Sequence, residues 1–205
     1  APPVHDMLPG MDHEPTVPSG DRLFGATFPC VCGRTHTIEP REIVYAEDAV
    51  EQLPAVCRRA VERGGHPQAK LAGVAAPALI LMDTRTRDVA GRAAAQALAA
   101  DGWPVRELVV PDPAPGRSPV CDDATKAALQ PQLAGAALLV AVGSGVINDL
   151  GKWLAFEAGI PYVCFATAVS MTGYASANVA PTVRGVKTLV DARPPFAVLA
   201  DPRVL

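Results

Sequence analysis

The stretch ALLVAVGSGVINDLGKWLAFEA, residues 137–158, decides the fold. It opens with Ala137 to Val142, an unbroken apolar run of the kind found in strands that are buried on both faces of a parallel sheet. Gly143-Ser144-Gly145 follows at once, and Ile147 to Ala158 has the pattern of a helix that ends at Gly159. The sequence therefore predicts a strand, a glycine-rich turn and a helix in immediate succession.

The same alternation continues on both sides of this stretch. Apolar runs predict further strands, and apolar residues spaced three and four apart predict further helices. The expected strands are 43–45, 77–82, 105–110, 161–166 and 196–200, and the expected helices are 49–63, 86–100 and 122–133. This order predicts an α/β fold with a doubly wound, mostly parallel, Rossmann-like sheet and right-handed crossovers.

Three segments complete the expected organisation. Residues 24–38 are expected to form a short strand or hairpin, and residues 179–190, divided by Arg184-Gly185, a β-hairpin near the C-terminal end. The proline-rich residues 1–22 are expected to form a poorly ordered tail. Residues 23–205 would then be one nucleotide-binding α/β domain.

Composition excludes several classes of function. Hydrophobic residues make up 49% of the 205, enough for a sizeable core, and the net charge of −3 comes without a basic stripe, which argues against nucleic-acid binding. No apolar run reaches the roughly 18–20 residues that a membrane span needs. The first residues, APPVHDMLPGMDHEP, lack the basic-then-apolar pattern of a signal peptide. We therefore expect a cytoplasmic protein with neither a nucleic-acid nor a membrane partner.

The five cysteines are expected to be reduced thiols, as in most cytosolic proteins. Cys30-Val-Cys32 with His36 raises the alternative of a zinc site. That spacing differs from the usual C-x₂₋₄-C, and no second cluster of Cys and His follows to supply four ligands. The sequence alone therefore disfavours zinc, and the expected metal ligands are none.

The glycine turn carries the strongest chemical signal. Glycines let the backbone approach a ligand closely, and the free N–H groups at a helix start favour an anion such as pyrophosphate. Asn148 stands where the third glycine of G-x-G-x-x-G would be, so the dinucleotide fingerprint is not met. A plain glycine turn between strand and helix stays open as the structural alternative.

Three charged residues near strand and helix ends have two interpretations each. Asp83 ends the first core strand, where a carboxylate can bind ribose hydroxyls, but local sequence favours a helix N-cap. Asp149 and Lys152 are spaced to form an ion pair on one helix face. Lys152 could instead reach a phosphate or a substrate oxygen.

The segment VAVGSGVINDLGKWLAFEAGIPYVCFATAVSMTGYASANVAPTVRGVKTLVDARPPFAVLADPRVL, residues 140–205, resembles the iron-type alcohol dehydrogenase and glycerol dehydrogenase superfamily. The likeness is greatest to bacterial-type sn-glycerol-1-phosphate dehydrogenases, which also carry a C-x-C-G…H segment like Cys30 to His36 and a stretch like Ile43 to Pro54. It covers roughly residues 24–205. 3-Dehydroquinate synthase shares the superfamily's fold.

The resemblance implies a set of binding residues for NAD or NADP and for substrate. Asp83 would contact the adenosine ribose and, as a free carboxylate, would weakly favour NAD over NADP. The cofactor-binding residues that it implies are Asp83, Gly143, Ser144, Gly145, Asp149, Lys152, Thr167 and Ser170, and those near the substrate are Thr172, Tyr174 and Ser176.

Two departures from the family pattern bear on function. Thr172 stands where relatives usually have an Asp beside the substrate hydroxyls, which puts the substrate's identity in doubt. The family's all-helical second domain, which carries the Asp and two His that bind zinc, iron or nickel, would follow Leu205 and is missing from this chain. These 205 residues alone are therefore expected to lack the metal site and to be inactive, with a partner, an oligomer or further chain covering the apolar surface.

The function implied is the NAD(P)-binding part of a metal-dependent dehydrogenase that acts on a small polyol or polyol phosphate, of the glycerol-1-phosphate and dihydroxyacetone-phosphate type. The metal would polarise the substrate oxygen, the cofactor would carry the hydride, and the protein is expected to be a homo-oligomer. A lyase like 3-dehydroquinate synthase and a non-catalytic nucleotide-binding module are the alternatives.

Overall fold

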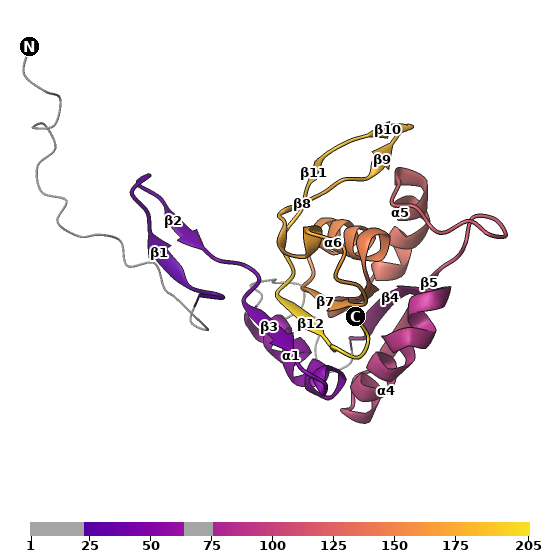
Figure 1. Cartoon of the computed structure of the whole chain (residues 1–205), viewed down its shortest axis with the longest axis horizontal. Helices are drawn as coiled ribbons and strands as arrows, with labels where there is room; N and C mark the ends of the chain where they lie inside the picture. Colours follow the sequence, from indigo (N-terminus) through magenta and orange to yellow (C-terminus); the bar gives the residue numbers. More distant parts are fainter. Residues whose placement is uncertain (1–22, 64–75) are drawn as a thin grey trace, which may run out of the picture. The chain divides into compact units, whose positions relative to one another are not determined.

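The structure is a computed structural model that describes residues 23–63 and 76–205 (Figure 1). The expected tail, residues 1–22, lies outside the described residues. The chain divides into two compact units, one up to Ile38 and one from Glu39 to Leu205. The expectation of one domain over 23–205 stays a prediction.

The first unit contains a short antiparallel hairpin. β1 (Thr27–Pro29) pairs with β2 (Thr35–Thr37), with Phe28 opposite His36. The sequence expectation of a strand or hairpin over 24–38 is thus resolved in favour of the hairpin. Both strands are largely exposed.

The second unit is built on a six-stranded parallel sheet in the order β3-β12-β7-β6-β4-β5. Its strands are β3 (Glu42–Tyr45), β4 (Ala78–Asp83), β5 (Val105–Val110), β6 (Leu138–Gly143), β7 (Tyr162–Ala166) and β12 (Ala197–Ala200). Each coincides with an expected strand to within a residue. The predicted doubly wound α/β fold is confirmed.

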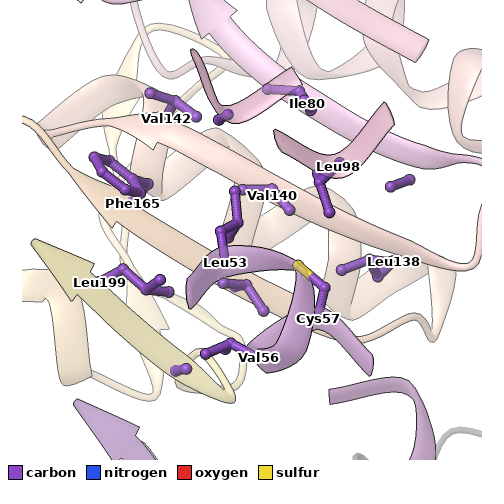
Figure 2. Close-up of a cluster of buried hydrophobic side chains, with 14 of the residues drawn as sticks. Leu53, Val56, Cys57, Ile80, Leu98, Leu138, Val140, Val142, Phe165 and Leu199 are labelled. Atoms are coloured by element: carbon purple, nitrogen blue, oxygen red, sulfur yellow. The ribbon is translucent and has the colours of Figure 1, made fainter. Parts of the chain in front are cut away.

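Helices cover both faces of this sheet. Side chains alternate along each strand, so Ile80 and Met82 join one core while Leu79 and Leu81 join the other. The first core packs against α1 (Ala49–Arg63) and α4 (Arg92–Ala100), and the second against α5 (Asp123–Leu129) and α6 (Gly145–Ala158). Figure 2 shows the first core, to which α1 contributes Leu53 and Cys57 and β6 contributes Leu138 and Val140.

The helix between β4 and β5 differs from the expected 86–100. It begins at α3 (Thr84–Thr86), because Asp83 caps it there, and passes through a π-helical turn, η4 (Arg87–Gly91), before α4. The turn places Gly91 against Met82: a Cβ on Gly91 would lie 2.3 Å from the Met82 sulfur. Close packing on the sheet thus accompanies the local widening of the helix.

Two other helix boundaries were also wrong. The expected helix 122–133 is α-helical only to Leu129 and continues as a 3₁₀ helix, η5 (Gln130–Leu133), which contains Pro131. The helix expected to begin at Ile147 begins at Gly145, which shortens the glycine turn.

The segment between β7 and β12 forms a 3₁₀ turn and a two-part hairpin. η6 (Gly173–Ala175) comes first; β8 (Asn178–Val179) pairs with β11 (Val190–Asp191), and β9 (Thr182–Val183) with β10 (Val186–Lys187). The expected hairpin around Arg184-Gly185 is confirmed, and Arg184 (φ 51°) and Gly185 (φ 78°) both have positive φ at its tip. Among the described residues, no helix is long and apolar enough to cross a membrane.

Candidate functional site

The candidate site lies where the strand order reverses. After β4 the chain moves to β5 on one side, then returns to β6 on the other side of β4 and continues to β7 and β12. Consistent with this, the connection after β4 covers one face of the sheet and α6, after β6, covers the other. Doubly wound sheets bind ligands at such a switch point, outside the carboxyl ends of the strands. Here Asp83 ends β4 and Gly143 ends β6.

The two glycines of the turn have different physical roles. A Cβ on Gly143 would lie 2.6 Å from the Ile147 Cβ, so any side chain there would collide with the first turn of α6. A Cβ on Gly145 would meet no atom within 4 Å, so the backbone at the helix start borders open space. Ser144, the N-cap residue, makes no side-chain cap bond, which leaves the first N–H groups of α6 for another acceptor. This turn fits an anionic group.

Gly143→Ala should destabilise the protein by about 1–3 kcal/mol, because the added methyl group must push α6 away from β6. Gly145→Ala is the matched control: it has room for the methyl group and should be neutral or slightly stabilising, since alanine favours helix. Urea unfolding of both variants measures the difference. Equal stabilities would contradict the assigned packing of Gly143.

Asn148, which breaks the G-x-G-x-x-G pattern, has a structural role. It is fully buried, and its side-chain oxygen accepts a hydrogen bond of 2.7 Å from the Tyr162 hydroxyl. Burial raises the pKa of Tyr162 well above its usual range, which keeps it a donor. The close contact between helix and sheet that a third glycine provides is supplied one turn later, at Gly151, where a Cβ would lie 2.9 Å from Ala141. Sequence reasoning missed both roles, although a glycine inside a helix pattern was a signal for the second.

Asp83 is a helix N-cap in this structure. Its Oδ1 accepts hydrogen bonds from the backbone N–H groups of Arg85 (2.9 Å) and Thr86 (2.7 Å), and the Thr86 side chain completes a capping box. Its Oδ2 faces the Arg85 guanidinium, which also pairs with Asp112. The carboxylate of Asp83 is therefore paired with a cation, unlike the free carboxylate on which the expected weak preference for NAD rested.

Lys152 does not form the ion pair with Asp149 that their spacing favoured. Its side chain is almost fully buried, and its Nζ donates to the Gly173 carbonyl (2.5 Å), the Ser176 hydroxyl (2.9 Å) and the Asn178 carbonyl (3.4 Å). Burial lowers the pKa of Lys152, and the nearby Asp149 carboxylate opposes that shift. Lys152 thus anchors the segment 173–178 to α6.

The remaining expected residues lie around this anchor. Asp149 is half-buried, and its Oδ1 would be 3.9 Å from a Cβ on Gly173. The Tyr174 hydroxyl donates to the Ala168 carbonyl (2.8 Å), and burial raises the pKa of Tyr174 to about 12. Thr167, half-buried, and the exposed Ser170 and Thr172 lie on the same loop after β7. The structure therefore gathers Asp149, Lys152, Tyr174 and Ser176, and leaves Ser170 and Thr172 open to solvent.

A cavity of about 300 Å³ adjoins the glycine turn. It is lined from α6 by Gly145, Val146 and Asp149, and from other elements by Val120, Cys121, Thr182 and Lys187. The hairpin of β9 and β10 is held beside it, because the Thr182 N–H donates to the Cys121 carbonyl (2.9 Å). No sequence signal identified Cys121, Thr182 or Lys187, since only the docking of the hairpin brings them here.

A second cavity, of about 220 Å³, opens near the other ends of the strands, where Pro161 and Phe196 precede β7 and β12. Arg41 and Arg193 line it. Because ligands of doubly wound sheets bind at the carboxyl ends, the cavity beside Gly145 is the candidate site.

Comparison with known proteins identifies the class to which this fold and turn belong. Residues 45–205 match the family model described as iron-containing alcohol dehydrogenase. The chain belongs to the iron-containing alcohol dehydrogenase family, as its resemblance predicted.

Particular relatives are glycerol-1-phosphate dehydrogenases [NAD(P)+]. The chain is 29% identical over 173 residues to the one from Thermococcus kodakarensis, which covers 84% of this chain and 44% of that protein. It is 31% identical over 128 residues to the one from Bacillus velezensis, covering 62% and 32%. Glycerol dehydrogenase from Schizosaccharomyces pombe has the same fold, with a TM-score of 0.65 at 16% identity over 82% of this chain and 39% of that one. The chain thus spans less than half the length of these relatives.

Proposed function

We propose that this chain binds the pyrophosphate of NAD or NADP at Gly143–Gly145 and the start of α6, as part of a metal-dependent dehydrogenase for a small polyol or polyol phosphate. The observation that carries the proposal is the open space beside Gly145, at an uncapped helix start on the strand-order switch point. The activity of the relatives, glycerol-1-phosphate dehydrogenase [NAD(P)+], supports the substrate class.

In this proposal the residues near the turn share the work of holding the cofactor. The N–H groups of α6 bind the pyrophosphate, and Lys187 at the rim of the cavity adds positive charge. Lys152 acts indirectly, because its three hydrogen bonds fix the segment that carries Tyr174 and Ser176. Thr167 and Ser170 face the nicotinamide side, and Thr172 the substrate. Arg85, half-exposed beside Asp83, admits NADP as well as NAD.

The family's catalytic metal would need ligands from outside the part of the chain that the structure describes. Among residues 23–63 and 76–205, no group of Asp and His side chains converges as the family's metal site requires. The one group of potential metal ligands found there consists of two Cys and one His in the first unit. When bound, the metal would polarise the substrate oxygen. We also propose that the protein assembles as a homo-oligomer, and sedimentation velocity tests this assembly.

The proposal is tested by replacing Gly145 with Asp. A carboxylate at the first turn of a helix favours the helix dipole, so the fold should persist, but its charge would occupy and repel the pyrophosphate site. We expect binding of NADH or NADPH, followed by nucleotide fluorescence, to weaken at least about tenfold, which corresponds to about 1.4 kcal/mol.

The matched control is Ala93→Asp, which adds the same charge on the exposed side of α4. It should bind the nucleotide like the unmodified chain. Equal affinities for the two variants would refute the turn as the pyrophosphate site, and an unmodified chain that binds neither nucleotide would refute the proposed function.

A further inference from the structure

The hairpin of the first unit brings three metal-ligating side chains together. Its turn is closed by two backbone hydrogen bonds, from Gly33 N–H to the Cys30 carbonyl (2.9 Å) and from Cys30 N–H to the Arg34 carbonyl (2.8 Å). Gly33 has a φ of 78°, a left-handed conformation that a glycine adopts without strain. The turn therefore holds the segment that carries Cys30 and Cys32 next to the start of β2, and β2 supplies His36.

The ligand atoms lie close to the spacing that a metal ion requires. The Cys30 Sγ, the Cys32 Sγ and a ring nitrogen of His36 all lie within 4.8 Å of one another, and the Cys32 Sγ is 3.1 Å from the His36 Nε2. Tetrahedral zinc with Zn–S of about 2.3 Å and Zn–N of about 2.0–2.1 Å places its ligand atoms about 3.5–3.8 Å apart. The ligand atoms are therefore at most about 1.3 Å further apart than that geometry requires. The sequence argument against zinc rested on the C-x-C spacing and on the lack of a second cluster of Cys and His, and the tight turn answers the first of these objections.

The hairpin also has a physical use for a metal. Each strand has three residues, and of these six only Phe28 is even partly buried. A two-stranded hairpin with so little apolar contact is marginally stable in water. Metal binding contributes its own free energy to the folded form, as in small zinc modules. Cys57, Cys121 and Cys164, by contrast, are buried among apolar side chains of the second unit.

We propose that Cys30, Cys32 and His36 bind one Zn²⁺ ion that holds the hairpin closed. Zinc is commonly bound by thiolate and imidazole ligands, whereas magnesium and calcium prefer oxygen ligands. Binding releases the two thiol protons, and the fourth position is filled by water or by a ligand from outside these three residues. The site is separate in chemistry from the family's catalytic metal, whose expected ligands are Asp and His.

The test is a Co²⁺ titration of the metal-free 205-residue chain with its thiols kept reduced. Cobalt bound by thiolates gives sulfur-to-metal charge-transfer absorption, which a site of Asp and His does not give. We expect these bands to saturate at one equivalent and to disappear on addition of Zn²⁺. Absence of thiolate bands would overturn the proposal.

Variants assign the site to the hairpin. The double variant Cys30→Ser, Cys32→Ser should lose the bands, and His36→Ala should keep weakened bands and bind Zn²⁺ on the order of 100-fold less tightly, since even the loss of an outer-shell partner costs 10–100-fold. Cys57→Ala removes a thiol elsewhere and should leave the titration unchanged. If the double variant kept the bands, or Cys57→Ala lost them, the metal would lie elsewhere. Thermal unfolding of each variant checks that the second unit remains folded.

Discussion

Replacing Lys152 with Met is expected to free the segment 173–178 while leaving the rest of the second unit folded. Lys152 has three donor hydrogens and three acceptors, of which two are backbone carbonyls, at Gly173 and Asn178. Met has a similar length and no donor. Hydrogen bonds to charged groups contribute about 1.5–3 kcal/mol each, so the loss of even one of the three should make local opening roughly 10–100-fold more frequent, and the loss of all three at least that much.

The global stability should change much less than the local stability. The lowered pKa of Lys152 means that burial destabilises its charged form by more than the nearby negative groups stabilise it. Removing that buried charge offsets much of the loss of the hydrogen bonds, as is common when apolar residues replace buried charges. Hydrogen exchange followed by mass spectrometry separates the two effects, because it reports 173–178 and α1 separately.

Lys126→Met is the control for this experiment. Lys126 on α5 pairs with Glu157 and lies 4.9 Å from the Trp153 ring, so its loss affects the packing of α5 on α6 and does not touch 173–178. Exchange in 173–178 should therefore match that of the unmodified chain. If Lys152→Met left exchange in this segment unchanged, Lys152 would not be its anchor.

The sequence predicted the sheet well because its strands are continuous apolar runs. Leu138 to Gly143 is fully buried, and such a run has few alternatives once a glycine turn and a helix follow. Helix boundaries were less predictable, since Asp83 could have been a ligand or a cap, and only the positions of the Arg85 and Thr86 N–H groups decide.

The candidate site was predictable only where it depends on neighbours in sequence. Gly143 and Gly145 stand out in the sequence, but the different reasons for each, contact with Ile147 and open space, require the packed helix. Lys152 was paired with Asp149 because residues three apart on a helix are neighbours. The structure turns it towards a segment more than twenty residues later, and no local pattern encodes that choice. The same holds for Thr182 and Lys187, which reach the cavity through the docked hairpin.

The second unit is expected to lose stability steeply above pH 9. Cys57 and Cys164 are fully buried, and burial raises the pKa of both thiols above the usual 9.0, to about 12 for Cys164. Below pH 9 both thiols are protonated in the folded and the unfolded chain, so they add no pH dependence. Above pH 9 the unfolded thiols ionise while the folded ones do not, and each thiol lowers the free energy of unfolding by about 1.4 kcal/mol per pH unit.

Other buried groups modify this profile in known directions. The pKa of Lys152 is lowered, so the unfolded chain binds the extra proton there, and stability rises with pH up to its usual 10.5. This opposes at most one of the two thiols. Burial also raises the pKa of the Cys121 thiol, to about 12, which adds to the loss above pH 9, and Tyr162 and Tyr174 have raised pKa values and add to it above pH 10. The net expectation is a small change up to pH 9 and a growing loss beyond it.

Urea unfolding midpoints between pH 7.5 and 10.5, with thiols kept reduced, measure this slope. The double variant Cys57→Ala, Cys164→Ala should be less stable at pH 8, because it leaves small cavities, but its loss from pH 9 to 10 should be smaller by about 2 kcal/mol. The variant Cys30→Ser, Cys32→Ser removes the same number of thiols from the hairpin and should keep the original slope. Parallel profiles for the unmodified chain and the Cys57, Cys164 variant would show that the buried thiols do not set the alkaline limit, because ionisation that is linked to unfolding must disappear with the groups that ionise.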